Sequence, residues 1–434
     1  MQGITLRNAL IFLLLLQLFS CKKEEDTQDP VIAIHSPVAD HTYNVYESVP
    51  VTADVTDETK ITSVVISLVS DNYTPVYIGL HLPVSSPHML VNTQYTLDNI
   101  HLETGLYYIM ITASDGTNDV RAYQPIHIIG VPRALKKIFV TTSSSTSATN
   151  MSVIDSTFIS AVSYHTFPGD YLGSSVSSYY QQVFMCGNYT GAYTSLELPL
   201  SAVKFSIAPL ISGNPYFTSY YPEDKKNYIA RYDGTIKGYN NNGDVVYSGT
   251  ANIGYYVIKM VMNDGHLVAF EQNKTSPAKL LVSFFTTGTP EQQTPITQDI
   301  VAFCEQDENN VFVFGNVAGQ GVIQLFDRIN NNLWNPYNYA LPVGSILSAV
   351  KIDANTYLIG LSNGTIYKYQ FLSSSLTVYT AGYTALQLRY DDVQNRIYVA
   401  EQNSVSAIDY PSTTFLGSVT SAENIKDISL LYNR

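Results

Sequence analysis

The sequence contains few cysteines and few charged residues, and its charge is unbalanced towards acid. Only 3 of its 434 residues are Cys and 14% are charged, whereas average soluble domains have roughly 25% charged residues. Cys186 and Cys304 lie far apart in the chain, so we expect two buried thiols rather than a disulfide. The net charge of −13 argues against nucleic acid or anionic lipid surfaces as partners, because both require basic patches.

The N-terminus has the organisation of a signal peptide. Arg7 precedes an apolar run of about 11 residues, 9–19, which is too short to span a bilayer as a helix. The run ends in Leu18-Phe19-Ser20-Cys21, which resembles the lipobox of bacterial lipoprotein precursors. That resemblance implies removal of residues 1–20 and acylation of Cys21, and several acyl chains make membrane anchoring stable. The alternative is an ordinary secretory signal that is cleaved nearby.

Residues 21–29 predict a flexible tether, since they are largely charged or polar and lack apolar periodicity. No Asp directly follows Cys21, and because an Asp there resembles an inner-membrane retention signal, the outer membrane is favoured. The run Lys22-Lys23-Glu24-Glu25-Asp26 resembles the surface-export tag of lipoproteins from Bacteroidota. We therefore expect a lipid-anchored outer-membrane protein at the cell surface, with a periplasm-facing protein as the alternative.

Residues 30–130 predict a β-sandwich. Apolar residues alternate at period two between Pro, Gly, Asn and Asp, as in short antiparallel strands. Asp29-Pro30-Val31-Ile32 and the later Ala113-Ser114-Asp115-Gly116 resemble the immunoglobulin-like modules of bacterial surface proteins, which implies a spacer domain. The expected strands are residues 31–34, 49–55, 61–68, 106–113 and 121–129.

Most of the 8 His residues lie in this first domain. None of them has a partner at the spacing of a metal site such as H-x-x-x-H, so we expect surface or strand histidines rather than ligands. The sequence predicts neither a metal nor a cofactor. The histidines concerned are His35, His41, His81, His88, His101 and His127.

Residues 134–434 contain an internal repeat. Apolar runs typical of β-strands recur roughly every 39 to 45 residues, and most of them follow an acidic or Asn-rich turn. A further strand begins soon after each run, so that four strands per unit and seven units predict a β-propeller. The recurring runs are residues 137–140, 182–185, 227–230, 266–269, 311–314, 356–359 and 396–399.

The two ends of the repeat region predict ring closure. Residues 425–431 resemble one more innermost strand, which the first unit lacks, and pairing the two ends would remove exposed sheet edges. The region resembles the broad group of NHL, YVTN and WD40-like propellers. It has neither the Trp-Asp dipeptide nor the sialidase-type Asp box, and propellers host many unrelated activities. Together, the two regions predict an all-β fold, an immunoglobulin-like sandwich followed by a seven-bladed β-propeller. The resemblances do not name a function.

Patterns of catalysis are nearly absent from the sequence. Gly360-Leu361-Ser362-Asn363-Gly364 fits the G-x-S-x-G pattern, but a hydrolase elbow needs a strand followed by a helix, and here a strand leads into another strand. We interpret it as a hairpin turn and assign no catalytic residue. Only His165 and His266 lie in the repeat region, which leaves few imidazoles for acid–base catalysis. The sequence leaves open whether two carboxylates form a catalytic pair.

Aromatic residues suggest a binding surface instead. In a propeller, the loops between blades and those between the second and third strands gather on one face, and tyrosine doublets crowd these places. Flat rings beside carboxylates and amides could bind a sugar or peptide by stacking and hydrogen bonding, although tyrosine also favours strands in general. The candidate ligand-binding residues are Tyr216, Tyr220, Tyr221, Tyr255, Tyr256, Glu271, Trp334, Tyr337 and Glu401.

Three functions are consistent with the sequence. The preferred one is a lipid-anchored binding protein that presents a propeller to a glycan, a peptide or a protein partner. The second is a structural subunit of an outer-membrane assembly, resembling the propeller lipoprotein of the barrel-assembly machinery. The third is a propeller enzyme of the lactonase, lyase or hydrolase kind, which would require a cluster of carboxylates or a metal.

Overall fold

The computed structural model describes residues 28–154, 158, 160–199, 201–337 and 339–434. Throughout these ranges the chain consists of β-strands joined by turns and loops, which confirms the all-β class. In the same ranges there is no helix with the length and apolar character needed to cross a membrane. The predicted signal peptide, the lipidation site Cys21 and most of the predicted tether lie outside the described residues.

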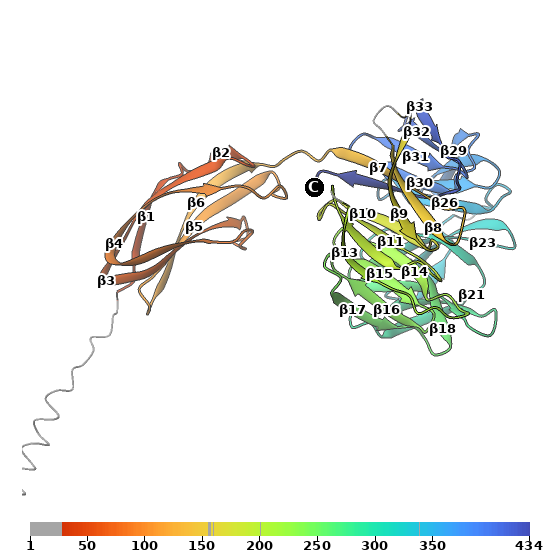
Figure 1. Ribbon diagram of the computed structural model, residues 1–434, viewed down its shortest axis with the longest axis horizontal. Coiled ribbons are helices and arrows are strands. Elements are labelled where there is room, and N and C mark those ends of the chain that lie inside the picture. Colours follow the sequence, from red (N-terminus) through yellow and green to blue (C-terminus); the bar gives the residue numbers. More distant parts are fainter. Residues whose placement is uncertain (1–27, 155–157, 159, 200, 338) are drawn as a thin grey trace, which may run out of the picture. The chain divides into compact units, whose positions relative to one another are not determined.

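The chain separates into two compact units, of which the first ends at Pro132 and the second runs from Arg133 to Arg434. Figure 1 shows the strands of unit 1 in red to orange. The strands of unit 1 are β1 (Val31–Ser36), β2 (His41–Asn44), β3 (Ser48–Ser70), β4 (Leu80–Thr96), β5 (Gly105–Ser114) and β6 (Asp119–Ile129).

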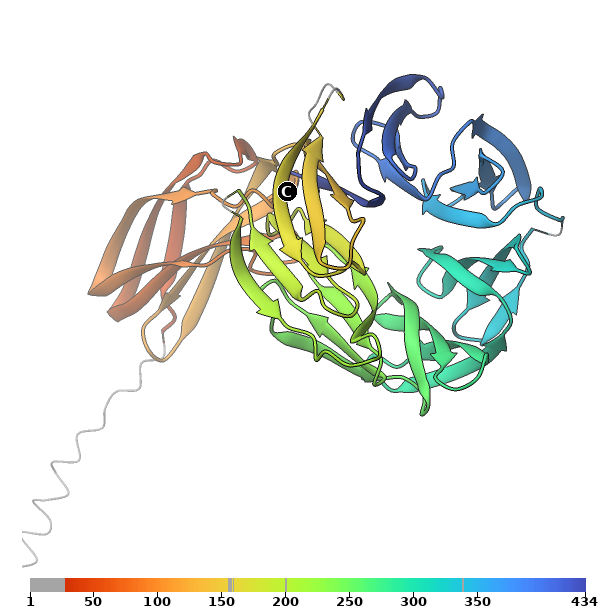
Figure 2. The same ribbon diagram turned by 45° about the vertical axis from the view of Figure 1, so that its right-hand side comes forward.

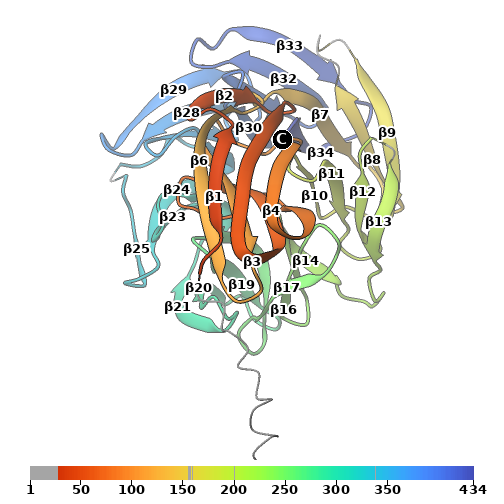
Figure 3. The ribbon, with the colours of Figure 1, turned by 90° about the vertical axis from the view of Figure 1, so that its left-hand side faces the viewer.

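The six strands of unit 1 form one hydrogen-bonded sheet in the order β1-β3-β5-β6-β2, with β4 also paired to β3. The long strand β3 pairs with β1 through its first half, while β4 follows both halves (Figure 3). The second half of β3 pairs with β5. The pairing of β3 with β4 is irregular between Thr56 and Ile61. Val51 before this point and Ile66 after it enter the same buried cluster. The sheet therefore folds over a single core.

Unit 1 differs from the sequence prediction in two ways. The expected strands 49–55 and 61–68 are parts of one strand, β3, because the polar residues between them continue the extended backbone. Strands β2 and β4 were not expected. In β4, Val91 and Tyr95 are buried while most other side chains are partly or fully exposed. The strand therefore lacks the apolar alternation by which its neighbours are predicted.

Unit 2 consists of seven four-stranded antiparallel sheets, and in six of them the strands follow each other in chain order. Figure 2 shows these sheets succeeding one another around a ring. The sheets are β10 (Gly173–Ser177), β11 (Gln182–Cys186), β12 (Tyr193–Glu197) and β13 (Ala202–Ile207); β14 (Phe217–Pro222), β15 (Asn227–Arg231), β16 (Thr235–Tyr239) and β17 (Val245–Thr250); β18 (Tyr255–Asn263), β19 (His266–Asn273), β20 (Lys279–Phe284) and β21 (Pro290–Ile296); β22 (Asp299–Glu305), β23 (Asn310–Val317), β24 (Gln320–Asp327) and β25 (Asn332–Trp334); β26 (Ile346–Lys351), β27 (Thr356–Leu361), β28 (Thr365–Gln370) and β29 (Ser375–Ala381); β30 (Gln387–Asp391), β31 (Arg396–Ala400), β32 (Ser404–Asp409) and β33 (Phe415–Thr420); and β34 (Ile425–Tyr432), β7 (Leu135–Thr142), β8 (Ala148–Ile154) and β9 (Ala161–Pro168).

Each of the recurring apolar runs is the second strand of its sheet. Strands β11 and β27, for example, are buried at every position, because a second strand has hydrogen-bonded neighbours on both edges and other sheets packed on both faces. The G-x-S-x-G segment is the turn between β27 and β28, as expected.

The two ends of unit 2 share one sheet. The C-terminal strand β34 pairs antiparallel with β7, with Ile428 opposite Val140 and Leu430 opposite Ile138. The last strand of the chain therefore supplies the first strand of the sheet with which unit 2 begins, as the sequence predicts. The pairing covers an edge of β7 that would otherwise be open to other chains.

A buried apolar cluster lies at every junction between neighbouring sheets of unit 2. Phe184 of β11 and Phe217 of β14 belong to one cluster, and Tyr398 of β31 and Ile428 of β34 belong to another. A buried aromatic or aliphatic side chain contributes about 1.5–3 kcal/mol. Since the last sheet packs on the first, the unit is a closed β-propeller with the first strands around its centre.

Candidate functional site

The loops at one end of the sheets bring distant residues together. In each sheet, the loop leading into the first strand and the loop between the second and third strands lie at the same end, because the strands alternate in direction. The Tyr216 N–H donates to the Asn188 carbonyl at 2.9 Å, and the Tyr232 N–H donates to the Tyr216 carbonyl at 3.2 Å. The loops of two neighbouring sheets therefore form one continuous surface.

Asp170 holds the loop that carries Tyr189. The Asp170 carboxylate is 9% exposed and accepts from the four backbone N–H groups of residues 188–191 at 2.8–3.2 Å. Burial alone would raise the pKa of Asp170, but these donors stabilise the ionised form and the pKa is lowered overall. A buried charge therefore fixes the backbone beneath Tyr189.

Glycine is required at both ends of the same loop. A Cβ on Gly187 would lie 2.2 Å from the Cα of Gly191, and a Cβ on Gly191 would lie 2.5 Å from the Asp170 carbonyl oxygen. Real atoms do not approach so closely, so the loop can pack on Asp170 only without side chains at these positions. Tyr189 itself remains 44% exposed. Its backbone is held while its ring is accessible.

Arg231 lies between two tyrosines at the end of β15. Its guanidinium carbon is 5.0 Å from the centroid of the Tyr216 ring, within the range of a cation–π interaction. An N–H of the same guanidinium donates to the buried Tyr239 hydroxyl oxygen at 3.3 Å. These contacts orient a positive charge beside an aromatic ring.

Tyr232 and Tyr256 form a second aromatic pair on this surface. Their ring centroids are 4.9 Å apart at an angle of 46°, and the Lys274 Nζ lies 5.4 Å from the Tyr232 centroid. Lys274 also donates to the Asp233 carbonyl at 3.2 Å. Burial raises the pKa of Tyr256, and Tyr232 and Tyr189 raise it further, so its hydroxyl stays a neutral donor at physiological pH.

These residues form a surface that we call the tyrosine face. The loops around it also expose aliphatic side chains, with Leu210 73%, Ile211 77% and Ile253 101% exposed. Rings, cations and aliphatic groups on fixed loops can stack on flat groups, donate hydrogen bonds and bury apolar surface. The tyrosine face consists of Tyr189, Tyr216, Tyr232 and Tyr256 with Arg231 and Lys274.

Four of the predicted ligand-binding residues lie at or beneath the tyrosine face. Tyr216 and Tyr256 belong to it, and Tyr255 precedes Tyr256 at the start of β18. Glu271 is fully buried below, where it accepts from the Asn252 backbone N–H at 3.2 Å and from the Asn252 side-chain amide at 2.9 Å. Burial raises the pKa of Glu271, and the Asn252 donors partly offset this. Glu271 therefore supports a loop and does not reach the surface.

Two further predicted residues line the centre of the ring instead. Tyr220 and Tyr221 of β14 both lie beside the central cavity. The Tyr220 hydroxyl donates to Asn227 at 2.8 Å, and the Tyr221 hydroxyl donates to Glu305 at 3.3 Å. Both rings point into contacts between strands, away from the tyrosine face.

The last three predicted residues lie on other sheets. Trp334 is in the outer strand β25 and is 41% exposed. Tyr337 packs edge-on against Tyr369 at 5.9 Å. Glu401 accepts from the Thr384 backbone N–H at 2.9 Å, which makes it a loop support. None of the three is brought to the tyrosine face.

The sequence reasoning missed four members of the tyrosine face: Tyr189, Tyr232, Arg231 and Lys274. Tyr189 and Tyr232 both lie in the turn after a second strand, and alignment of the repeats at that turn would have found them. The sequence pattern does not single out Arg231 and Lys274, because single basic residues near strand ends are common in any β-protein. Only the contacts between loops identify them.

A central cavity of about 1070 Å³ is the second candidate site. All seven first strands contribute to its wall, including Ser174 of β10, Lys259 of β18 and Arg389 of β30. The cavity lies entirely within unit 2. It has the size of a small-molecule site, which is typically 300–1000 Å³.

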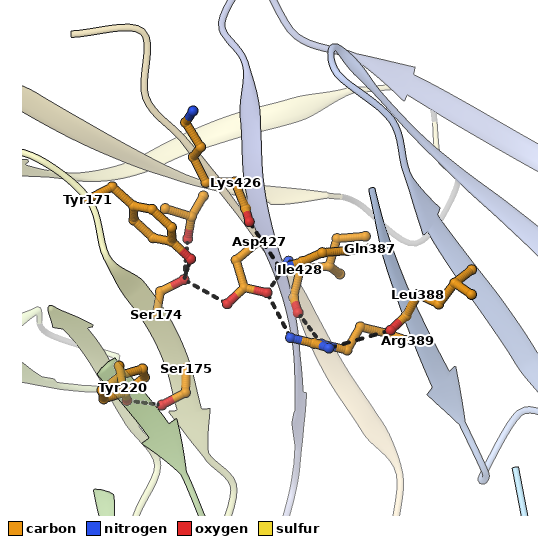
Figure 4. A network of polar contacts seen from close by, with 11 residues as sticks. Tyr171, Ser174, Ser175, Tyr220, Gln387, Leu388, Arg389, Lys426, Asp427 and Ile428 are labelled. Atoms are coloured by element: carbon orange, nitrogen blue, oxygen red, sulfur yellow. Dashed lines mark hydrogen bonds and ion pairs between the residues drawn. The ribbon is translucent and has the colours of Figure 1, made fainter. Parts of the chain in front are cut away.

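A network of polar contacts crosses the wall of this cavity (Figure 4). The buried Asp427 carboxylate accepts from Arg389 Nη2 at 2.9 Å and from Ser174 Oγ at 3.1 Å. The Arg389 Nε–H also donates to the Ile428 carbonyl at 2.9 Å, and Gln387 Nε2 donates to the Lys426 carbonyl at 3.0 Å. These bonds join the sheet of β30 to the sheet of β34 and balance the charge of Arg389.

The described part of the chain contains no group of three or more His, Cys, Asp or Glu side chains that could hold a metal ion. In unit 1, His35 and His88 both contact the Asp54 carboxylate, at 2.8 and 3.2 Å. Hydrogen bonds from these two rings lower the pKa of Asp54. Cys186 and Cys304 are free thiols, and burial raises the pKa of both.

Comparison with known proteins gives information about the fold only. No family model and no curated protein matches the chain. Among solved structures, a functionally unknown protein from Desulfotomaculum acetoxidans is 12% identical, with a TM-score of 0.51 over 68% of this chain and 99% of that one.

Two other solved structures have lower scores. A quinoprotein alcohol dehydrogenase-like protein from Bacteroides thetaiotaomicron is 11% identical, with a TM-score of 0.45 over 94% of this chain and 100% of that one. The Cps50 (Swd1) β-propeller domain of Myceliophteria thermophila is 9% identical, with a TM-score of 0.45 over 58% of this chain and 87% of that one. At such identities, similarity concerns the fold and not the function.

Proposed function

We propose that this protein is a lipid-anchored binding protein of the bacterial cell surface, which uses the tyrosine face to bind a protein or peptide partner. The proposal rests on the placement of partly exposed aromatic and cationic side chains, and of exposed aliphatic ones, at one end of the sheets. Buried carboxylates of Asp170 and Glu271 hold the backbones of these loops. Such preorganisation lowers the entropy lost on binding.

The composition of the tyrosine face favours a protein partner over a glycan. Tyr and Arg are the residues most enriched among binding hot spots, and both are present in Tyr216 and Arg231. Leu210, Ile211 and Ile253 are largely exposed on neighbouring loops. Exposed aliphatic side chains gain little from a hydroxylated sugar, whereas they fit the apolar core of a protein interface.

The remaining organisation of the chain fits display at a surface. In the proposal, the lipid on Cys21 anchors the mature protein in the outer membrane, residues 22–29 form a tether, and unit 1 is an immunoglobulin-like spacer before a seven-bladed propeller. Palmitate labelling should then be lost in Cys21→Ser. External protease should cut unit 2 in intact cells. Protection in intact cells that ends on permeabilisation would place the protein on the periplasmic side instead.

Site-specific photocross-linking tests the binding face directly. A benzophenone amino acid at Ile211 or Ile253 of the full chain in intact cells should give a discrete cross-linked species with a partner protein. Val378, which is 61% exposed on the outer strand β29, is the matched control and should give none. Equal cross-linking at all three positions, or none at Ile211 and Ile253, would contradict the proposal.

A further inference from the structure

The central cavity contains a positive charge with no negative partner. Lys259 of β18 lines the cavity, and within the described residues its amine forms no ion pair with a carboxylate. The neighbouring Arg389, in contrast, is paired with Asp427 at 2.9 Å. The chain has a net charge of −13, so acidic side chains outnumber basic ones. A lysine without an acidic partner is therefore unusual in this protein.

The carboxylates that line the same cavity have other roles. Asp224 accepts from the backbone N–H groups of Ser178 and Tyr179 at 2.6 and 3.2 Å, which joins two sheets. Burial raises the pKa of Glu223, and the charge of nearby Lys226 partly offsets this. Neither group compensates the charge of Lys259.

Lys259 departs from the residues at equivalent positions. Five of the first strands have an irregularity near their start, and the residue that follows it is Ser219, Lys259, Ala302, Ser348 or Asp427. Ser219, Ser348 and Asp427 are short and at most 7% exposed, whereas Lys259 is exposed to the cavity. The fold therefore requires only a short residue at this position, and the lysine serves another purpose.

The surroundings of Lys259 favour an anion. Burial by the surrounding sheets lowers the pKa of the Lys259 amine, and the positive charge of Arg389 lowers it further. The side chain is in contact with the cavity, yet the sheets around it displace the bulk water that would solvate the charge. A bound anion would supply the missing compensation.

The cavity wall also offers hydrogen-bonding groups. Each first strand is the end strand of its sheet, so one edge of its backbone faces the centre of the ring. At β34 this edge is bonded by the side chains of Gln387 and Arg389. Side chains also bond some edge groups of other first strands, as Asn316 does at Ile346 of β26. Edge N–H and C=O groups that no side chain bonds could pair with hydroxyl groups of a ligand.

We propose that the central cavity binds a small polyhydroxylated carboxylate, such as a sugar acid, with the carboxylate at Lys259. The Lys259 ammonium matches one carboxylate charge, and the other basic residues of the wall, Arg133, Arg389 and Arg434, have partners of their own. A phosphate dianion would leave a negative charge unbalanced. The volume of about 1070 Å³ accommodates such a ligand with water. The site is separate from the tyrosine face and does not depend on the function proposed for it.

Titration of the full chain with glucuronate, galacturonate and gluconate, followed by calorimetry, tests this site. At least one acid should bind, while glucose and inorganic phosphate should bind at least tenfold more weakly. Lys259→Met should weaken binding of the acid about 30-fold or more, because a charge-assisted contact is lost. Lys259→Arg should retain most of it. Lys368→Met, which removes a lysine of strand β28 that does not line the cavity, is the control and should leave binding unchanged.

Isotope-labelled lysine provides a second measurement. Binding of the acid should raise the pKa of the Lys259 amine, observed by NMR. If Lys259→Met does not fold, this titration in the unmodified protein decides the question. Absence of binding by all three acids, equal binding of phosphate, or an unchanged Lys259 pKa would each overturn the proposal. Partner cross-linking at Ile211 should be unaffected by Lys259→Met, so the two sites can fail independently.

Discussion

Loops at equivalent positions of the ring carry different chemistry in different sheets. The second strand of the β14–β17 sheet ends at Arg231, and the chain continues through Tyr232 and Asp233, so that two residues of the tyrosine face lie at this turn. After the second strand of the β30–β33 sheet, it continues through Glu401 and the polar residues Gln402 and Asn403. Because the backbone role of the two turns is the same, the difference in side chains points to function.

Similarity between sheets is equally informative. Glu271 and Glu401 each lie at or just after the end of a second strand, and each accepts from a backbone N–H in the loop that leads into the first strand of its own sheet, at Asn252 and at Thr384. The distances are 3.2 and 2.9 Å. A role that recurs in two sheets with different surfaces is structural. Both glutamates were predicted to touch a ligand, and the structure shows that each supports a loop.

The largest expected effect concerns partner binding at the tyrosine face. Tyr232→Ala removes the ring between Tyr256 and Lys274 and should weaken the captured interaction about 30-fold or more, as truncation of an aromatic hot spot does. Asn403→Ala at the equivalent turn should change affinity by less than about twofold. The measurement is a binding titration with the cross-linked partner. Equal effects of both substitutions would remove the distinction between the two sheets.

The sequence predicts the ring because its signals are local and repeated. Buried second strands such as β27 must be apolar throughout, and their hairpin turns require Asn, Asp or Gly, so the period is visible. The pairing of β34 with β7 also follows from counting strands. The irregular strand β4 is not predictable in this way, since most of its side chains are partly exposed and carry no alternation.

The tyrosine face could be predicted only in part. With 34 tyrosines in the chain, a tyrosine in a turn is not distinguishable from one in a strand by residue type. Tyr216 and Tyr232 become one site through a backbone hydrogen bond between loops. Lys259 was hidden for another reason, because a lone lysine in an apolar strand has no pattern, and its significance comes from the cavity around it.

The next largest effect should distinguish the two supporting glutamates. Glu271→Ala leaves the partly buried Asn252 N–H without its acceptor and should lower the free energy of unfolding by about 1–3 kcal/mol. Glu401→Ala should cost less than about 1 kcal/mol, since water can reach the Thr384 N–H at this exposed position. Chemical denaturation measures both. A larger loss for Glu401→Ala would contradict the assignment.

The stability of Glu271→Gln as a function of pH tests whether the charge of Glu271 matters for its supporting role. Because the pKa of Glu271 is raised in the folded protein, its ionisation above the unfolded value of about 4.3 opposes folding, and this cost is absent at lower pH. Glutamine keeps an acceptor for Asn252 without a charge. The substitution should therefore be neutral or stabilising at pH 7, and any gain should vanish near pH 4. A loss at pH 7 as large as that of Glu271→Ala would show that the charge itself supports the loop.

A further effect is expected at Asp170, whose ionised carboxylate holds the Tyr189 loop. Its folded pKa is lowered, so its contribution to stability is present above the unfolded value of about 3.9 and is lost as pH falls through the folded value. Asp170→Asn retains one acceptor oxygen but turns an amide towards the Tyr189 N–H, which should cost about 1–2 kcal/mol at pH 7. The difference from the unsubstituted protein should shrink below about pH 4. A difference that stays constant with pH would mean that shape, and not charge, holds the loop beneath Tyr189.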